Sequence, residues 1–287
     1  MNRIRKGFKR RLANKEFAIG FALVSVIVGL AVCGPWLAPR DPLALSWTPF
    51  LQPSAGSIFG SDTLGRDVLS RVMSGGQVIL IASAVTALGA YLIGLPIGIM
   101  AALSGSPAAR GVLRSMDVIL AFPPMLLILV IAAANGISLF SVILGALIAQ
   151  VPSVARVAYS ASTDVALSGF VESAKIRGES TLWIVSRELI PNISRALAAD
   201  VGVRVTLSIL LITAANFLGV GAQPPGADWG LMLSENRYGF ENNPFAMLVP
   251  ALVIAFLTIG VSFLADSLSQ VQQRNGAVGE QSEDDDA

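Results

Sequence analysis

The residues most able to do chemistry lie in one charged stretch, residues 156–195, between two long apolar blocks. The stretch carries nine charged side chains, five basic and four acidic. The whole sequence contains no histidine and a single cysteine, Cys33. Histidine-based zinc sites, Ser-His-Asp and Cys-His catalysis and a disulfide framework are therefore excluded. The chemistry left to the stretch is ionic contact, and we expect no catalytic site in this chain.

Asp200 and Arg204 form a second candidate group. They are four residues apart and so share one face of the helix that we expect over residues 196–220. An ionisable residue inside a membrane is a functional candidate by default, so this pair could line a transport pathway. The two charges can also neutralise each other as a structural ion pair. The sequence leaves both interpretations open.

A glycine-rich segment, residues 60–67, is similar to a phosphate-binding loop because four residues separate Gly60 from Gly65. However, Arg66 and Asp67 stand where such a loop requires lysine and then serine or threonine. No hydroxyl is available there to bind magnesium. We therefore reject nucleotide binding by this segment.

The composition is that of an integral membrane protein. Hydrophobic residues make up 54% of the 287 residues, and charged residues only 14%. A soluble domain carries about 25% charged residues. The formal net charge of +1 gives no bulk basicity that would favour nucleic acid as a partner. We expect an all-α fold whose surroundings are the lipid bilayer.

Apolar runs of sufficient length predict six transmembrane helices. Pro42, Pro49 and Pro53 make residues 39–77 a poor helix, so we interpret them as an external loop. A charge-free run over residues 118–155 is nearly twice the length of one crossing, and Asn135-Gly136 divides it with a turn. The predicted spans are residues 17–38, 78–103, 113–134, 138–158, 196–220 and 246–268.

The third predicted span contains an acidic residue, Asp117, and a pair of prolines, Pro123 and Pro124, and both indicate what surrounds the helix. Asp117 follows Arg114 by three residues near the inner surface, and we expect a solvated ion pair there. Pro123 and Pro124 leave carbonyl groups without partners at mid-membrane. This suits a helix that is packed among others or that lines a cavity.

The distribution of basic residues predicts the orientation. With six spans, fifteen Lys and Arg residues fall on the side of the two termini and four fall on the other side. Because Lys and Arg favour the cytoplasm, we expect both termini inside the cell. Residues 1–16 then form a basic cytoplasmic segment, and residues 269–287 an acidic, disordered cytoplasmic tail. The five helices of residues 78–268 form a core that carries a cytoplasmic loop, residues 159–195.

The pattern within this loop predicts two short helices joined by a glycine turn. Lys175 can share a helical face with both Glu172 and Glu179. Gly178 can end the first helix and let the second leave at a steep angle. Pro191 is expected to close the second helix and to set φ for the span that follows.

This loop resembles the EAA loop of binding-protein-dependent ABC importer permeases. Glu172, Ala174, Gly178 and Pro191 fall at matching positions of that pattern, whereas Ser173, Glu188 and Ile190 depart from it. The resemblance implies a loop that docks on an ATPase subunit and transmits its movement. The coupling residues that it implies are Glu172, Ser173, Ala174, Gly178, Glu179, Ser180, Trp183 and Pro191. An ordinary amphipathic cytoplasmic loop is the plain alternative.

Three other blocks resemble the peptide-permease branch of that family: residues 60–71, 117–124 and 216–235. Together with the loop, they resemble permease subunits of the dipeptide, oligopeptide and nickel class, in the second-permease (C-type) branch. The fold implied is the six-helix type I ABC importer permease in a bacterial cell membrane. Peptides are the implied substrate, although nickel chelates, glutathione and sugars are carried by relatives.

The resemblance also implies partners. They are a second homologous permease, two ATPase subunits or a fused pair, and an extracytoplasmic substrate-binding protein. ATP and magnesium would be bound by the ATPases, so this chain would hold no cofactor and would not be an enzyme. A secondary, ion-coupled transporter is the alternative class, and only Asp200 and Arg204 could serve as its ion relay.

Overall fold

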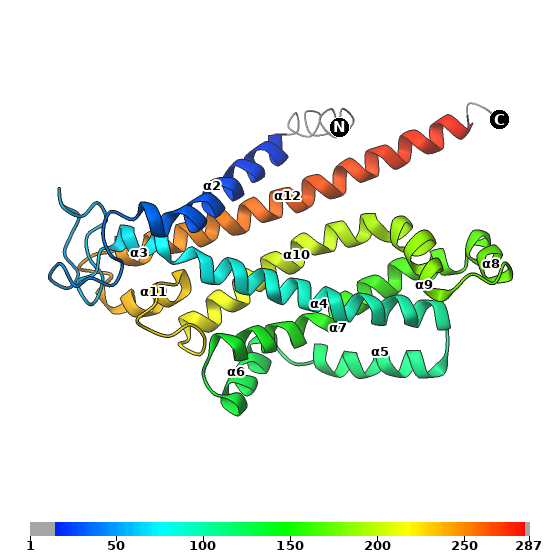
Figure 1. Cartoon of the computed structure of the whole chain (residues 1–287), viewed down its shortest axis with the longest axis horizontal. Helices are drawn as coiled ribbons and strands as arrows, with labels where there is room; N and C mark the ends of the chain where they lie inside the picture. Colours follow the sequence, from blue (N-terminus) through cyan, green and yellow to red (C-terminus); the bar gives the residue numbers. More distant parts are fainter. Residues whose placement is uncertain (1–14, 285–287) are drawn as a thin grey trace.

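The computed structural model describes residues 15–284, with side chains as far as residue 267. Within these residues the regular secondary structure is helical, apart from isolated bridges in residues 45–67. Figure 1 shows long helices side by side, with irregular loops at one end and the short helices α8 and α9 at the other. The long elements are α2 (Lys15–Leu37), α4 (Gly76–Ser104), α7 (Leu139–Ala166), α10 (Ile190–Phe217) and α12 (Phe245–Asp284).

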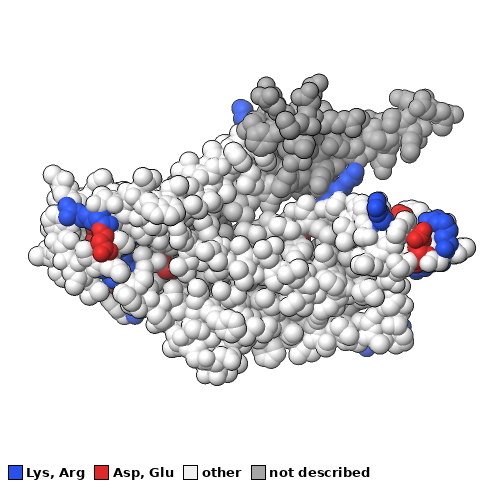
Figure 2. Space-filling view, viewed as in Figure 1, with Lys and Arg blue, Asp and Glu red and all other residues white. Residues whose placement is uncertain are grey.

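The described residues hold five helices or joined helices that are long and apolar enough to cross a membrane. Counting one bent pair as a further span raises the number to six. Figure 2 shows charged side chains gathered at the two ends of the visible face, with a broad uncharged band between them. The predicted all-α membrane fold is confirmed.

The third predicted span, residues 113–134, is not one continuous helix. The structure has α5 (Pro107–Leu120) and α6 (Pro124–Asn135), which meet at an angle of 87°. The cause is the Pro123-Pro124 pair. Proline supplies no backbone N–H and disfavours helical geometry in the residue before it, so a helix ends there and a new one begins on Pro124.

Pro191 does not close a separate short helix, contrary to our expectation. Helix α9 (Thr181–Ile184), a π-helical turn (η1, Val185–Leu189) and α10 follow one another without a break over 37 residues. Pro191 lies in the first turn of α10, where a missing N–H is tolerated. The Asn192 side chain donates a hydrogen bond to the Glu188 carbonyl oxygen at 2.6 Å, which satisfies a nearby acceptor.

The C-terminal segment also departs from expectation, because α12 continues to Asp284 and the predicted disordered tail is therefore helical over residues 269–284. Extending an existing helix needs no new nucleation, and residues 269–284 contain no proline to end it. Residues 285–287 lie outside the described residues. So do residues 1–14 of the predicted basic N-terminus, and Lys15 and Glu16 begin α2.

Glycines permit the closest helix contacts in the bundle. A Cβ atom at Gly94 of α4 would lie 2.7 Å from the Val151 carbonyl oxygen of α7, and one at Gly98 would meet the Ala155 carbonyl oxygen. Helices α2 and α12 approach in the same way at Gly20 and Gly260 and lie side by side in Figure 1. Small residues at such contacts let helix backbones approach closely within a membrane.

Two shorter helices complete the end where the irregular loops lie. Helix α3 (Val68–Ser74) leads into α4, and α11 (Trp229–Asn236) lies between α10 and α12, followed by the 3-10 turn η2 (Arg237–Gly239). The buried Trp229 side chain donates from Nε1 to the Val72 carbonyl oxygen at 2.7 Å. This bond fixes α11 against α3 and so joins two loops that are distant in sequence.

Candidate functional site

The charged stretch projects beyond the thickness of a bilayer. Helix α7 has 28 residues, about 42 Å at 1.5 Å per residue, against about 30 Å for the hydrocarbon core. The joined helix of residues 181–217 is longer still. Helix α8 (Gly169–Ile176) lies between them, at the end of the molecule where one of the two charged groups of Figure 2 gathers. The stretch is thus a protruding helical loop.

The predicted turn at Gly178 is present. Gly178 has φ of 79°, in the left-handed region that favours glycine. Its amide nitrogen donates to the Lys175 carbonyl oxygen at 3.0 Å, and the Glu179 amide nitrogen donates to the Ala174 carbonyl oxygen at 3.1 Å. These two bonds form a Schellman motif, which ends α8 and allows α9 to start in a new direction.

The predicted coupling residues divide into an exposed set and a buried anchor. Ala174 is fully buried with Val171, and both pack in a small core with Ile184 and Leu189. Glu179 and Trp183 are half-buried. The exposed members of the predicted set are Glu172, Ser173, Gly178, Ser180 and Pro191. The loop is therefore a packed unit, and most of the predicted coupling residues lie on its outer surface.

Arg177 connects the two helices of the loop. Its Nε atom lies 3.8 Å from Glu179 Oε1, and its guanidinium lies 6.0 Å from the centre of the Trp183 ring. Helical spacing predicted an ion pair between Lys175 and Glu179, but Glu179 pairs with Arg177 instead. The reason is that the turn at Gly178 interrupts the helix between Lys175 and Glu179. Ser180 caps α9 by accepting a hydrogen bond from the Trp183 amide nitrogen at 3.2 Å.

Large apolar side chains stand exposed on the same loop, which sequence reasoning missed. Leu167 is 82% exposed, Ile176 80% and Leu182 78%. The loop projects past the hydrocarbon core, so lipid does not account for these exposures. Apolar surface that is rimmed by charge marks a protein contact site. The sequence feature that could have indicated these exposed side chains is the presence of single leucine and isoleucine residues within a polar stretch.

The second candidate group, Asp200 and Arg204, forms a close ion pair on α10. Arg204 Nη2 lies 2.8 Å from Asp200 Oδ1, and the side chains are 11% and 8% exposed. Tyr91 of α4, which the sequence did not single out, donates from its hydroxyl to Asp200 Oδ2 at 2.7 Å. The same face of α10 carries Ser208, which accepts a hydrogen bond from Gln150 Nε2 of α7 at 2.9 Å.

Asp117 pairs with Arg156 of α7 rather than with Arg114. Arg156 donates from Nε to Asp117 Oδ1 at 2.9 Å, and its Nη2 atom also contacts that oxygen. The predicted partner was wrong because α5 packs along α7, which brings a cation 39 residues away closer than the neighbour on the same helix. The pair is exposed and therefore contributes little to stability.

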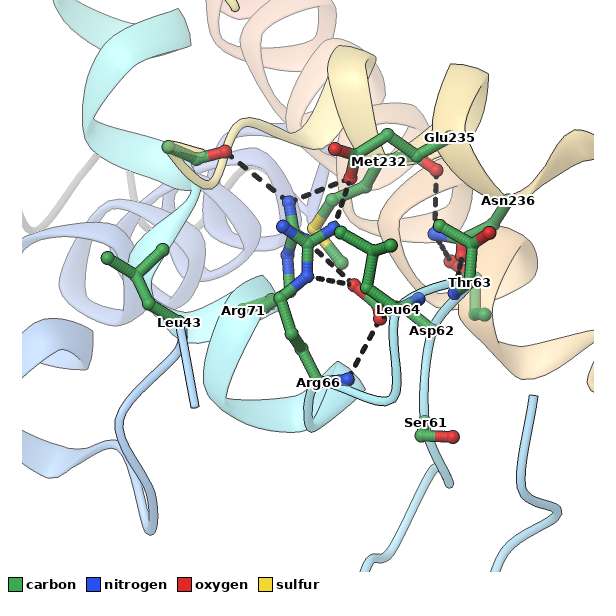
Figure 3. A network of polar contacts seen from close by, with 12 residues as sticks. Leu43, Ser61, Asp62, Thr63, Leu64, Arg66, Arg71, Met232, Glu235 and Asn236 are labelled. Carbon is green, nitrogen blue, oxygen red and sulfur yellow. Dashed lines mark hydrogen bonds and ion pairs between the residues drawn. The ribbon is translucent and has the colours of Figure 1, made fainter. Parts of the chain in front are cut away.

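A buried charge cluster at the opposite end was also missed. We call it the external cluster, after the side of the membrane that the distribution of Lys and Arg predicts for it. It consists of Asp62, Arg66, Arg71 and Glu235 (Figure 3). Asp62 Oδ2 lies 2.6 Å from Arg66 Nε and 2.7 Å from Arg71 Nη1. Glu235 Oε2 lies 2.9 Å from each arginine. The cluster ties the loop after α2 to α11.

This cluster shows what the charged residues do in the segment that is similar to a phosphate-binding loop, residues 60–67. Arg66 is engaged by Asp62 and Glu235, and Asp67 accepts from the Ser70 amide nitrogen at 2.9 Å as the N-cap of α3. The side chains that would have to bind a nucleotide are thus used internally. Asn243 completes the assembly by donating to the carbonyl oxygens of Leu51, Phe59 and Ser61.

Two acids at this end have altered pKa values. Burial raises the pKa of Glu235 to about 7, the Asp62 charge adds to the shift and the Arg66 guanidinium opposes it. Burial also raises the pKa of Asp228, against the effect of hydrogen bonds from the Leu231 and Gly230 backbone and the Asn216 side chain. Among the described residues no three acidic or cysteine side chains are placed to hold a metal ion.

The bundle and its protruding loop define a class of protein: a polytopic membrane subunit with an intracellular or extracellular helical contact site between two spans. Comparison with known proteins identifies the family. Residues 94–275 match the family described as "Binding-protein-dependent transport system inner membrane component". The chain belongs to this family and is a multi-pass permease subunit of a binding-protein-dependent ABC importer. The alternative of a secondary transporter is thereby set aside.

Several curated relatives extend over most of the chain. A putative peptide transport system permease protein of Brucella abortus is 31% identical over 264 residues, which cover 92% of this chain and 89% of the relative. The glutathione transport system permease protein GsiD of Escherichia coli O6:K15:H31 is 32% identical, with 91% and 87% covered. The probable D,D-dipeptide transport system permease protein DdpC of Escherichia coli K12 is 30% identical, with 86% and 83% covered.

A solved structure shares the fold. A chain of the MetNI methionine ABC transporter, in an inward-facing conformation, superimposes with a TM-score of 0.56. It is 17% identical, and the match covers 71% of this chain and 95% of that one. The predicted type I importer permease fold is confirmed by this likeness.

Proposed function

We propose that this chain imports peptides as one half of a pore whose other half is a second, homologous permease. Two ATPase subunits, or a fused pair, drive it from the cytoplasm, and an extracytoplasmic binding protein delivers the substrate. The observation that carries the proposal is the protruding loop of residues 167–191. It places the residues of the EAA-like pattern around a glycine turn at one end of a membrane bundle.

The composition of the loop surface suits an ATPase as the docking partner. The exposed side chains of Leu167, Ile176 and Leu182 would enter an apolar cleft of the ATPase. The exposed acid Glu172 and the basic residues Lys175 and Arg187 would lie at the rim of the contact. Charges at a rim set the partner and the orientation more than they add affinity.

The continuity of α9, η1 and α10 offers a route for mechanical coupling. Residues 181–217 form one helical element, so a displacement of the docked end moves a membrane-spanning helix directly. ATP binding would close the ATPase pair and favour one of two arrangements of the bundle. Hydrolysis would return the bundle to the other, which is alternating access. This chain itself contributes no nucleotide site.

The direction of insertion follows from the same proposal. The loop of residues 167–191 would face the cytoplasm, and the external cluster would face the binding protein. Figure 1 places the first residues of α2 and the end of α12 toward the end of the molecule that carries α8 and α9. Both termini would then be cytoplasmic, in agreement with the distribution of Lys and Arg.

Peptides are the substrate class that the relatives favour, because those described above are named for peptides, D,D-dipeptides and glutathione. All of these molecules are short and carry both an amino group and a carboxylate.

The proposal is tested by purifying the tagged complex in mild detergent and identifying its subunits by mass spectrometry. We expect an ATPase, a second permease and a binding protein. The recovered complex is then reconstituted in liposomes and supplied with labelled di- and tripeptides, including glutathione. ATP-dependent uptake supports the proposal. Recovery of an intact complex that transports none of these compounds, with labelled nickel chelates or sugars taken up instead, contradicts the peptide assignment.

A further inference from the structure

A polar group lies near the middle of the bundle, far from both ends. Tyr91 is about 22 Å from the start of α4 and about 20 Å from its end, at 1.5 Å per residue. Its hydroxyl donates to Asp200 Oδ2 at 2.7 Å, and Arg204 Nη2 donates to Asp200 Oδ1 at 2.8 Å. We call these three residues the mid-membrane triad. It links α4 to α10.

Stability alone does not account for the mid-membrane triad. Asp200 and Arg204 are four residues apart on one helix, so they could neutralise each other without any contact to α4. Replacing a buried ion pair by apolar residues is often neutral or stabilising, so burying the pair is not a requirement of the fold. The hydrogen bond from Tyr91 is an additional, directional contact, and it joins two helices through residues that are 109 positions apart in the sequence.

One continuous helical element connects the triad to the loop of residues 167–191. Asp200 lies on the same continuous helical element as α9, about 28 Å from Thr181. The helix to which Tyr91 belongs is itself bound tightly to α7, because Gly94 and Gly98 let the two backbones approach. The triad is therefore a polar contact through which movement of α10 would reach the paired helices α4 and α7.

A second bond runs parallel to the first. Gln150 Nε2 of α7 donates to Ser208 Oγ of α10 at 2.9 Å, and the Ser208 hydroxyl donates to the Arg204 carbonyl oxygen at 2.8 Å. Helix α10 is thus held to α4 at Asp200 and to α7 at Ser208. These directional contacts in an apolar interior fix the rotation of α10 as well as its distance from its neighbours.

We propose that Tyr91 is a positioning residue for transport, acting through Asp200. Its hydrogen bond makes α4, α7 and α10 move as one body when α9 is displaced. This inference rests on the proposed function, because it concerns how movement from an ATPase is transmitted. Without the Tyr91 hydroxyl, α10 still moves with the ATPase but α4 follows it incompletely, so ATP is hydrolysed without a matching passage of substrate.

The test compares Tyr91→Phe with the matched control Tyr159→Phe. Tyr159 lies half-buried on α7, and its hydroxyl has no hydrogen-bond partner among the described residues. Each complex is reconstituted in liposomes with its ATPases, second permease and binding protein. ATP hydrolysis and uptake of labelled di- and tripeptides, including glutathione, are measured together. For Tyr91→Phe we expect the ATP hydrolysed per peptide to rise about tenfold or more, because the loss of one hydrogen bond to a charged group changes an equilibrium constant by at least about that factor.

The outcomes are distinguishable. A raised ratio in Tyr91→Phe, with Tyr159→Phe equal to wild type and all complexes assembled to the same yield, supports the inference. An unchanged ratio in Tyr91→Phe overturns it. A lower melting temperature or yield of the Tyr91→Phe complex with an unchanged ratio also overturns it, since the contact is then structural only. Absence of uptake by the wild-type complex contradicts the proposed function instead.

Discussion

The Glu179 amide nitrogen donates a hydrogen bond to the Ala174 carbonyl oxygen at 3.1 Å, across the turn at Gly178. Ala174 is fully buried in the small core of the loop, whereas Glu179 lies at its outer side beside Arg177. The bond therefore joins the packed base of the loop to its contact surface. It also fixes the direction in which α9 leaves α8, and this direction determines the shape offered to a partner.

Gly178→Leu tests that turn. Nothing lies within 4 Å of a Cβ atom at Gly178, so the effect of the substitution comes from the backbone conformation rather than from crowding at Cβ. The left-handed backbone costs about 1–2 kcal/mol for an L-residue, and relaxing it reorients α9. We expect normal membrane insertion but more ATP hydrolysed per peptide transported.

Two variants control this experiment. Gly178→Asn should retain most of the coupling, since asparagine visits the left-handed region. Gly111→Leu, at an exposed glycine of α5 with open space around it, should have no effect. Equal uptake and equal ATP consumption by wild type and Gly178→Leu would show that the turn has no part in coupling.

Leu182→Asp tests the apolar contact surface. The leucine is 78% exposed and is absent from the loop's small core, so the change should leave folding intact. A carboxylate buried without a partner in the ATPase contact should reduce recovery of the ATPase with the tagged permease at least tenfold. The control is Ile58→Asp, at a 65% exposed residue of the external loop. Undiminished ATPase recovery with Leu182→Asp would place the contact elsewhere.

Arg71→Ala tests the external cluster. Arg71 is fully buried, and its removal leaves Asp62 and Glu235 to share Arg66 alone. Breaking such a buried network costs about 3–5 kcal/mol, so the purified protein should melt at a clearly lower temperature. Arg237→Ala, at an exposed arginine nearby, should melt as the wild type does. Similar melting of both variants would mean that the cluster does not stabilise this end.

Asp228→Asn tests the pH dependence of stability. Burial raises the pKa of Asp228. At pH values between the ordinary aspartate pKa and the raised one, the folded protein therefore keeps a proton that the unfolded chain has lost. The stability from this group is thus present below the ordinary aspartate pKa and is lost as the pH rises through the raised one. Asparagine keeps an oxygen acceptor for the Leu231 amide nitrogen, which the native side chain caps at 3.0 Å.

The measurement is the melting temperature of both proteins between pH 5 and pH 8. The difference, wild type minus Asp228→Asn, should fall as the pH rises. A difference that stays constant or increases with pH would show that Asp228 is ionised in the folded protein throughout this range.

The features that could be predicted from the sequence are those set by residues close to one another along the chain. The turn at Gly178 needs only a glycine after a helix, and the Asp200–Arg204 pair needs only a spacing of four residues. The Pro123-Pro124 pair was noted in the sequence, but the 87° bend between α5 and α6 that it causes was not predicted.

The missed features depend on helices meeting in space. Tyr91 lies in a charge-free run, and nothing local to it indicates that Asp200 is its partner. Arg66 and Glu235 are 169 residues apart, so their contact exists only after the loops at that end have folded together. Exposure of Ile176 was equally hidden, because an isoleucine beside a helix end is as easily buried as exposed.

The central claim, that the loop of residues 167–191 docks on the ATPase, is tested most directly by site-specific crosslinking. Cys33 is replaced by serine, which leaves no native cysteine, and Ile176→Cys is introduced at a position that is 80% exposed. A short bifunctional crosslinker is then applied to the assembled complex in membranes. We predict a permease–ATPase product from Ile176→Cys and none from the external control Ile58→Cys. A product from Ile58→Cys and none from Ile176→Cys would contradict both the docking site and the proposed orientation.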